Sequence, residues 1–259
     1  MKTEFTSDRE KKNYFNRMSE AQRIDAFRTM LTWAGHAVFL GGAGVSTESG
    51  IPDFRSRNGL YHRTAKRFSR YAPEYLLSND CLCNEPEVFF DYYRHNLDAR
   101  AVQPNAAHLR LAEWEASGLL DGIVTQNIDG LHQAAGSENV LELHGSIQRA
   151  YCSRCRKSFD ADLMNHGTGV PRCGCGGVIR PDIVLYEEAL DQDVMRAAIQ
   201  YIRNADVLIV GGTSLKVYPA AGLINYYRGD KLVLITRSST PAEADLVIHG
   251  KIGEVFSQV

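Results

Sequence analysis

The sequence contains a series of short apolar runs in which hydrophobic residues follow one another without alternation. A strand with this pattern is buried on both faces, which is typical of parallel sheets covered by helices. Segments with helical spacing separate several of the runs, and the alternation of strand and helix predicts an α/β fold with a parallel sheet. The predicted helices are 19–33, 106–117 and 191–203, and the predicted strands are 36–40, 122–125, 140–143, 182–186, 205–210 and 231–236.

Two segments break this alternation. Residues 56–100 are polar and aromatic, and we predict that they form a helical insert. Residues 151–180 carry four cysteines together with glycine and proline, and show little apolar periodicity. The expected organisation is a Rossmann-like core made of 20–55, 101–150 and 181–259, a small domain made of the helical insert and the cysteine-rich module, and an N-terminal extension over 1–19.

Composition and charge exclude several classes of protein. The 259 residues are 44% hydrophobic and 23% charged, and the net charge is -2, whereas a protein that binds nucleic acid through bulk electrostatics would be basic. No apolar run approaches the ~20 residues that cross a bilayer, and the first twenty residues lack the apolar core of a secretory signal. We therefore expect a cytoplasmic protein that binds neither nucleic acid nor membrane, with a monomer as the default state.

Four of the six cysteines form two closely spaced pairs. Cys152 and Cys155 are separated by two residues, Cys173 and Cys175 by one, and 17 residues lie between the pairs. In a reducing compartment such cysteines are interpreted first as metal ligands, and four thiolates form the closed site typical of structural zinc. The alternative is four unpaired buried cysteines. The other two, Cys81 and Cys83, are interpreted as structural or incidental, with an additional thiol site as the alternative.

A glycine-rich turn follows the first predicted strand. Gly41, Gly42 and Gly44 precede a polar stretch that includes Ser46 and Thr47. Glycines at such a turn let backbone N–H groups approach a pyrophosphate closely. The third glycine of the dinucleotide-binding fingerprint would fall at Thr47. The turn alone therefore fits phosphate binding and an ordinary tight turn equally well.

Longer motifs extend this turn and lead to a known family. The segment 42–55, GAGVSTESGIPDFR, resembles the signature of the sirtuins, the NAD-dependent protein deacylases. Three more blocks match in order: TQNID at 125–129, LHGS at 143–146 and GTSLKVYPA at 212–220. The resemblance covers residues 20–259. It also places the four cysteines where sirtuins carry a structural zinc ion, although the second sirtuin pair is often Cys-x-x-Cys.

The resemblance implies NAD as co-substrate and an acylated lysine of a protein or peptide as the second substrate. It makes His144 the general base, because an imidazole titrates near neutral pH and can accept a proton from a ribose hydroxyl. Asn127 is the second implied catalytic residue; with Gln126 it holds the ribose, while Ile128 and Asp129 shape the nicotinamide pocket. The implied cofactor-binding residues are Ala43, Gly44, Ser46, Thr47, Asp53, Phe54, Arg55, Gln126, Asn127, Ile128, Asp129, His144, Gly212, Thr213, Ser214, Thr236 and Ile252.

Two of these roles have a simpler structural alternative, and one position differs from the family. Asn127 and Asp129 could cap the helix that follows them, which is a common use of these side chains. Thr236 stands where sirtuins commonly have an asparagine that touches the adenine ribose, and its side chain is shorter than that of asparagine. Two further histidines, His108 and His132, do not fall on the sirtuin catalytic position and are interpreted as structural.

Two local differences bear on the substrate. Tyr186 and Glu187 stand within a stretch where many sirtuins read Phe-Gly-Glu, on the edge to which the substrate peptide adds as a strand. Sirtuins that prefer acidic acyl groups carry a Tyr-x-x-Arg pair, whereas Tyr92 is followed at that spacing by His95. The resemblance therefore implies a neutral acyl group, acetyl first of all.

The implied activity is deacylation of protein lysine, with release of nicotinamide and O-acyl-ADP-ribose. The first alternative is mono-ADP-ribosyl transfer or NAD hydrolysis at the same site, because an activated ribose can be captured by another nucleophile or by water. The second alternative is a non-catalytic NAD-dependent binding module.

Overall fold

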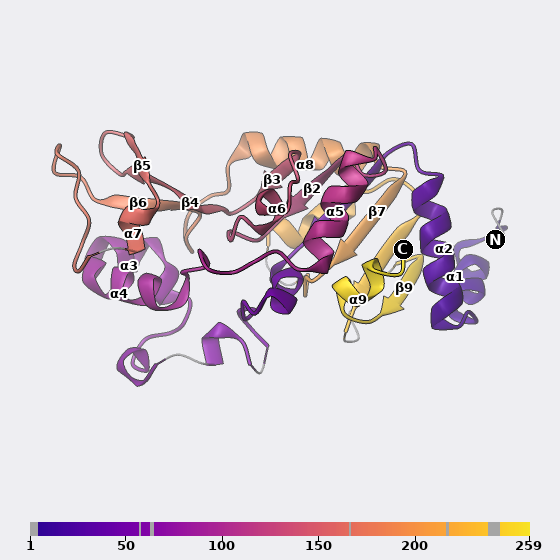
Figure 1. Ribbon diagram of the computed structural model, residues 1–259, viewed down its shortest axis with the longest axis horizontal. Coiled ribbons are helices and arrows are strands. Elements are labelled where there is room, and N and C mark those ends of the chain that lie inside the picture. The colour runs from indigo at the N-terminus through magenta and orange to yellow at the C-terminus, as the bar shows by residue number, and fades with distance from the viewer. Residues whose placement is uncertain (1–4, 57, 63–64, 166, 216–217, 238–243) are drawn as a thin grey trace.

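The structure is a computed structural model that describes residues 5–56, 58–62, 65–165, 167–215, 218–237 and 244–259 (Figure 1). A large sheet with its helices occupies one end of the elongated molecule, and a small module of short strands and helices occupies the other. The first described helix, α1 (Asp8–Asn16), and the C-terminal end both lie beside the large sheet, away from the small module.

The large sheet is entirely parallel. Its strands are β1 (Ala37–Gly41), β2 (Gly122–Thr125), β3 (Val140–Glu142), β7 (Val207–Gly211), β8 (Leu232–Thr236) and β9 (Leu246–His249), in the order β3-β2-β1-β7-β8-β9. Strand order reverses where β1 pairs with both β2 and β7, and ligands of such sheets bind at the carboxyl ends of the strands at this point. The predicted α/β fold with a Rossmann-like sheet is therefore confirmed.

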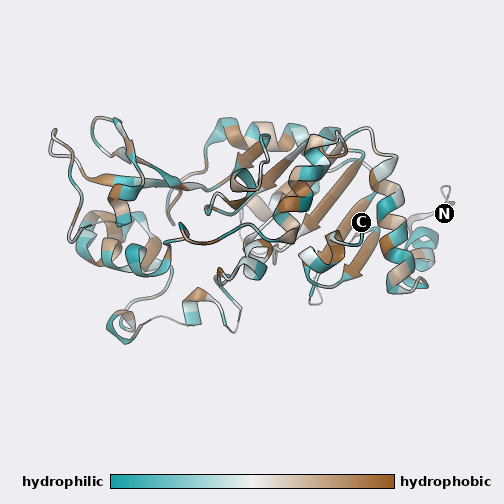
Figure 2. Cartoon of the chain, viewed as in Figure 1, coloured by the Kyte–Doolittle hydropathy of each residue, from teal (hydrophilic) through white to brown (hydrophobic). Residues whose placement is uncertain are grey.

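Helices cover both faces of this sheet. On one face, α2 (Glu20–Thr32), α5 (Ala106–Ala116) and α9 (Ile252–Phe256) pack on alternate strand residues. On the other face, α8 (Gln192–Asn204) and the 3-10 segment η5 (Ala220–Tyr226) pack on the intervening residues. Burial on both faces accounts for the continuous apolar runs in the sequence, and Figure 2 shows the large strands as the most hydrophobic part of the chain.

The N-terminal region adds a helix to this layer. α1 (Asp8–Asn16) contacts edge strand β9, and Phe15 joins the hydrophobic core. Lys11 is only 7% exposed, and its ammonium group lies 3.0 Å from a carboxylate oxygen of Asp245. The helix thus covers one edge of the sheet, which would otherwise present unpaired backbone groups.

The small module has its own sheet and core. Strands β4 (Gly145–Cys152), β5 (Ser158–Asp160) and β6 (Ile179–Ile183) are antiparallel in the order β5-β4-β6. Its helices are α3 (Asn79–Asn84), α4 (Pro86–Asn96) and α7 (Asp162–Asn165), and the buried aromatic rings of α4 fill its core. The remaining helical segments, in either part of the molecule, are the short α-helix α6 (Leu131–Ala134) and the 3-10 helices η1 (Ala43–Ser49), η2 (Leu60–His62), η3 (Lys66–Phe68) and η4 (Tyr75–Leu77).

One strand prediction is wrong in both place and partner. The apolar run at 182–186 was expected to join the parallel sheet, but β6 ends at Ile183 and pairs antiparallel with β4. A short apolar run indicates burial without specifying which sheet buries it. None of the helices in the part of the chain described here is both long and apolar enough to cross a membrane.

Candidate functional site

Two glycine turns pack against each other at the carboxyl ends of β1 and β7. The backbone N–H of Gly44 donates to the carbonyl oxygen of Gly212 at 2.7 Å. A Cβ on Gly44 would lie 2.7 Å from the Cα of Gly212, and Gly212 has a φ of 65°. Side chains at these two positions would clash, so glycine is needed for the approach of the two turns. The turn after β1 continues into the 3-10 helix η1, which contains Ala43, Ser46 and Thr47.

Ser46 is the centre of a buried polar network. Its hydroxyl donates to Oδ2 of Asp129 at 2.6 Å and accepts from Nδ2 of Asn127 at 2.9 Å. All three side chains are buried, with exposed fractions of 8% or less. Oδ1 of Asp129 accepts from the N–H of Leu131 at the start of α6, so the capping alternative for Asp129 is also realised. The network brings together residues from the ends of β1 and β2 that the sequence predicted as site residues.

His108 joins this network from α5. The N–H of Asn105 donates to Nδ1 of His108 at 3.3 Å, which leaves the proton on Nε2, 3.5 Å from the hydroxyl of Ser46. Burial lowers the pKa of His108 to about 4, so the imidazole is neutral at pH 7. The sequence pattern predicted only a structural role for His108. The available signal was its position three residues after Asn105, which caps the start of α5.

A second buried histidine lies behind His108. The ring of His132 is 4.9 Å from that of His108, and its side chain is 1% exposed. Neither ring nitrogen of His132 has a hydrogen-bond partner among the described residues. Burial lowers the pKa of His132 to about 3, so both imidazoles of this pair are uncharged near neutral pH.

His144 lies between the two sheets, after the carboxyl end of β3 and directly before β4. Its Nδ1 is 2.8 Å from the carbonyl oxygen of Gln126, and its own carbonyl oxygen accepts from the N–H of Val184 at 2.9 Å. Since a carbonyl only accepts, we assign the proton to Nδ1, which leaves Nε2 as a proton acceptor. Burial lowers the pKa of His144, outweighing the hydrogen bond to Gln126, which acts in the opposite direction.

Gln126 also connects this position to the neighbouring strand ends. Its Nε2 donates to Oγ1 of Thr213 at 3.1 Å, across the carboxyl end of β1. Ser214, the next residue, is exposed, and Thr236 is half-buried at the end of β8. Ile252 packs close to Gly211 at the end of β7: a Cβ built on that glycine would lie 3.0 Å from the Cδ1 of Ile252. Lys216 and Val217, in the fourth matching block, lie outside the described residues.

The segment after η1 contains the remaining predicted residues. Oδ1 of Asp53 accepts from the N–H groups of Arg55 at 3.1 Å and of Ser56 at 2.7 Å, which forms a tight Asx-type turn. The ring of Phe54 packs edge-on against Tyr61. Arg55 is exposed and donates to the hydroxyl of Tyr186 rather than to another predicted site residue. Ile128 packs against the core of the small module.

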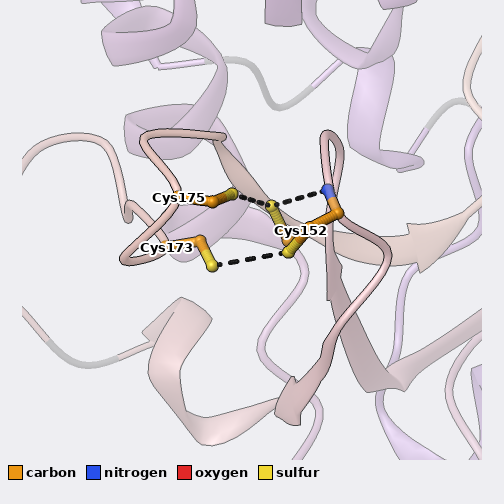
Figure 3. Close-up of side chains that lie close together, drawn as sticks. Cys152, Cys173 and Cys175 are labelled. Carbon is orange, nitrogen blue, oxygen red and sulfur yellow. Dashed lines mark hydrogen bonds between the residues drawn. The ribbon is translucent and has the colours of Figure 1, made fainter.

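The four paired cysteines meet at one point of the small module. Figure 3 shows three of them, Cys152, Cys173 and Cys175. Their sulfur atoms all lie within 4.8 Å of one another; Cys152 and Cys175 are 3.4 Å apart, and Cys155 and Cys173 are 3.7 Å apart. Tetrahedral zinc with Zn–S bonds of about 2.3 Å requires sulfurs about 3.8 Å apart. The arrangement therefore fits one structural zinc ion, as the spacing predicted.

The local backbone favours the thiolate form of one ligand, Cys152. The N–H groups of Cys155 and Arg154 point at the sulfur of Cys152, at 3.5 Å and 3.4 Å, and lower the pKa of this thiol to about 6. Cys81 has the opposite environment: it is fully buried, and burial raises the pKa of its thiol to about 12. This agrees with a structural role for Cys81, while Cys83 is exposed.

Comparison with known proteins gives consistent matches. The model of the Sir2 family matches residues 42–219. A protein of Clostridium acetobutylicum named NAD-dependent protein deacetylase is 53% identical over 241 residues, which cover 92% of this chain and 98% of that protein. A protein of the same name from Staphylococcus aureus is 44% identical over 238 residues, covering 91% and 97%.

Solved structures of similar proteins match over a comparable length. A Sir2 protein with a p53 peptide and NAD+ superposes with a TM-score of 0.80 at 37% identity, covering 91% of this chain and 96% of that one. A Sir2 variant with deacetylated p53 peptide and 3'-O-acetyl ADP ribose superposes with a TM-score of 0.83 at 36% identity, with the same coverage.

Proposed function

This chain belongs to the Sir2 family, and from that premise we infer that it is an NAD-dependent protein deacetylase. The observation that carries the inference is the convergence of His144, Gln126 and the Ser46 network at the carboxyl edge of the parallel sheet. That edge is where sheets of this type bind nucleotides. The full-length relatives that match the chain are named for the same activity.

The residues at this edge fit the chemical groups of NAD. The close-packed glycine turns leave backbone groups where a pyrophosphate can approach. The amides of Gln126 and Asn127 are suited to ribose hydroxyls, and Asp129 with Ile128 to the carboxamide of nicotinamide. Phe54 and Arg55 lie on the loop that we assign to the cofactor. The other assigned contacts are Ala43, Gly44, Ser46, Thr47, Asp53, His144, Gly212, Thr213, Ser214, Thr236 and Ile252.

His144 is the residue to which we assign proton transfer. When bound, NAD supplies the ribose that accepts the acyl group from lysine. The Nε2 of His144 is free to accept the proton of a ribose hydroxyl, because Nδ1 is held by the carbonyl of Gln126. Asn127 is assigned as its partner in orienting the ribose, since its side chain is fixed by Ser46.

The zinc ion has a structural role in this proposal. Cys152, Cys155, Cys173 and Cys175 would hold it in a closed site with no position left for substrate. We also propose that residues 56–100 and 151–180, together with the parts of β4 and β6 that lie outside these bounds, act as a small domain beside the core. For the compartment we propose the cytoplasm, because none of the six cysteines, all of which are described, forms a disulfide.

The test is a reaction of the purified chain with NAD and a panel of acyl-lysine peptides. We expect nicotinamide and deacetylated peptide in equal amounts, with acetyl-lysine preferred over acidic acyl groups. Mass spectrometry separates the alternatives, because ADP-ribosyl transfer adds mass to a protein whereas deacetylation removes it. Release of nicotinamide without deacetylation would indicate an NAD hydrolase, and no release at all would indicate a binding module.

A further inference from the structure

The segment 184–188, which follows β6, is held firmly by the small module. The N–H of Tyr186 donates to the carbonyl of Leu77 at 3.0 Å, and the carbonyl of Tyr186 accepts from the N–H of Asn79 at 3.1 Å. The carboxylate of Glu187 accepts from the N–H of Asp80 at 3.0 Å. Glu187 has a φ of 75°, a conformation that these contacts must stabilise. The side chain of Tyr186 therefore projects from a rigid support.

The loop that we assign to the cofactor is closed on itself. The N–H of Leu60 donates to the carbonyl of Asp53 at 2.7 Å, and the N–H of Tyr61 donates to the carbonyl of Phe54 at 3.0 Å. Gly59 permits this closure, because a Cβ there would lie 2.7 Å from the carbonyl oxygen of Asp53. We call residues 53–56 and 58–62 the cofactor loop. Its internal bonds make it a unit that can move as one body.

Tyr186 connects these two parts through its hydroxyl. The hydroxyls of Tyr61 and Tyr186 are 2.5 Å apart, and Nη2 of Arg55 donates to the Tyr186 hydroxyl at 3.0 Å. The guanidinium of Arg55 also lies 5.6 Å from the centre of the Tyr61 ring. Burial raises the pKa of Tyr61, so its hydroxyl keeps its proton and can donate. A phenylalanine at 186, as in the Phe-Gly-Glu stretch of many sirtuins, could make neither hydrogen bond.

We propose that Tyr186 is a positioning residue for the cofactor: its hydroxyl holds Tyr61 and Arg55, and so fixes the cofactor loop on the 184–188 segment before NAD binds. This rests on the proposed function for the assignment of the loop to NAD. Without the hydroxyl the loop samples more conformations, so fewer molecules hold it in the conformation that binds NAD. The apparent affinity for NAD falls in proportion to the fraction of molecules in that conformation. One or two hydrogen bonds of ordinary net strength correspond to a loss of roughly 3- to 10-fold.

The test compares Tyr186→Phe, Tyr61→Phe and the double variant with the unmodified chain. Binding of ADP-ribose is measured by calorimetry and loop opening by hydrogen exchange at the amides of Leu60 and Tyr61, whose acceptors lie within the loop. We expect each single variant to weaken ADP-ribose binding roughly 3- to 10-fold and to speed exchange, and the double variant to add little. Tyr75→Phe is the matched control, because its hydroxyl binds Glu85 in the same module.

Kinetics on an acetyl-lysine peptide separate this role from others. We expect the KM for NAD to rise. We expect kcat and the KM for the peptide to stay nearly unchanged. A rise confined to the peptide KM, additive losses in the double variant, or tighter ADP-ribose binding would each overturn the proposal. If the unmodified chain binds ADP-ribose but does not deacetylate the peptide, the proposed function fails. The comparison of ADP-ribose binding between Tyr186→Phe and the unmodified chain still tests the role of Tyr186. If the unmodified chain does not bind ADP-ribose, hydrogen exchange is the deciding measurement. Equal exchange rates in Tyr186→Phe and the unmodified chain would then overturn the proposal that Tyr186 fixes the cofactor loop.

Discussion

The Nδ1 atom of His144 lies 2.8 Å from the carbonyl oxygen of Gln126. This contact selects one tautomer of the imidazole and one ring orientation, because a carbonyl oxygen accepts only from a protonated nitrogen. It also connects the assigned base to Gln126, the residue that follows β2 and donates to Thr213. The position of the base is therefore set by the sheet edge that holds the assigned cofactor contacts.

Replacing His144 by alanine tests its assignment as the base. We expect deacetylation to fall by at least about 100-fold, in line with the loss of a general base, while the fold is retained. The measurement is steady-state release of nicotinamide together with deacetylated peptide. His36→Ala is the control, since His36 forms a hydrogen bond with Asp121 at the amino ends of β1 and β2, away from the candidate site. Near-normal turnover of His144→Ala would refute the assignment.

The decrease of kcat/KM at acidic pH tests the protonation of the same imidazole. A base must be neutral to accept a proton, and burial lowers the pKa of His144 from its ordinary value near 6.5. The neutral form therefore persists to lower pH, so kcat/KM should fall only as the pH drops through a midpoint below 6.5. A midpoint at or above 6.5 in the unmodified chain would contradict this.

Removing the hydroxyl of Ser46 takes a hydrogen-bond partner from three buried groups. In Ser46→Ala, Oδ2 of Asp129 loses a donor, and Nδ2 of Asn127 and Nε2 of His108 each lose an acceptor. Each unsatisfied buried group costs about 1–3 kcal/mol, so we expect lower Tm and at least ~10-fold weaker activity. Denaturant unfolding and a rate assay measure both effects. Ser69→Ala, which removes an exposed hydroxyl bonded to Lys66, should change neither.

The buried histidine pair makes stability depend on pH. The pKa values of His108 and His132 are lowered to about 4 and about 3, whereas both are near 6.5 in the unfolded chain. Between these values the unfolded state binds more protons, so the free energy of unfolding decreases as the pH falls below 6.5. Each histidine contributes a slope approaching about 1.4 kcal/mol per pH unit.

His132→Phe is the variant that isolates this effect, because the new ring keeps contact with Phe39 and removes one titrating group. We expect the decrease in stability between pH 7 and pH 5 to be smaller than that of the unmodified chain by about 2 kcal/mol, the contribution of one such histidine. His249→Phe, an exposed position, should leave the dependence unchanged. Equal slopes in His132→Phe and the unmodified chain would rule out the explanation.

Loss of one cysteine ligand tests the zinc site. Cys175→Ser should reduce bound zinc from about one ion per chain toward none and lower the Tm, because metal binding contributes directly to the folding of such modules. Elemental analysis and thermal unfolding are the measurements. Cys83→Ser replaces an exposed cysteine outside the cluster and should keep its zinc. Full zinc content in Cys175→Ser would mean that this residue is not a ligand.

Features encoded by local pattern could be predicted well. The run at 122–125 coincides with β2, and the spacing of four cysteines predicted a cluster that the structure brings within 4.8 Å. Strand β9 was not predicted from the sequence. The partner sheet of the 182–186 run depends on tertiary pairing, which an apolar run does not specify.

The unpredicted contacts of the site join distant segments. His108 reaches Ser46 across 62 positions, and Tyr186 reaches Tyr61 across 125. Each depends on the orientation of a side chain that periodicity does not determine. The roles carried over from the sirtuin resemblance placed Ser46, Asn127 and Asp129 in one site, but gave no sign of which atoms would meet.

Two residues separate the end of β3 from the start of β4, and His144 is one of them. Its imidazole is held by Gln126, which follows β2, whereas its carbonyl is held by Val184 beyond β6. The assigned base thus lies at the junction of the parallel sheet and the small module. Any rotation of the small module against the parallel sheet would tilt this ring, so a ligand that contacts both would align the proton acceptor through its own binding.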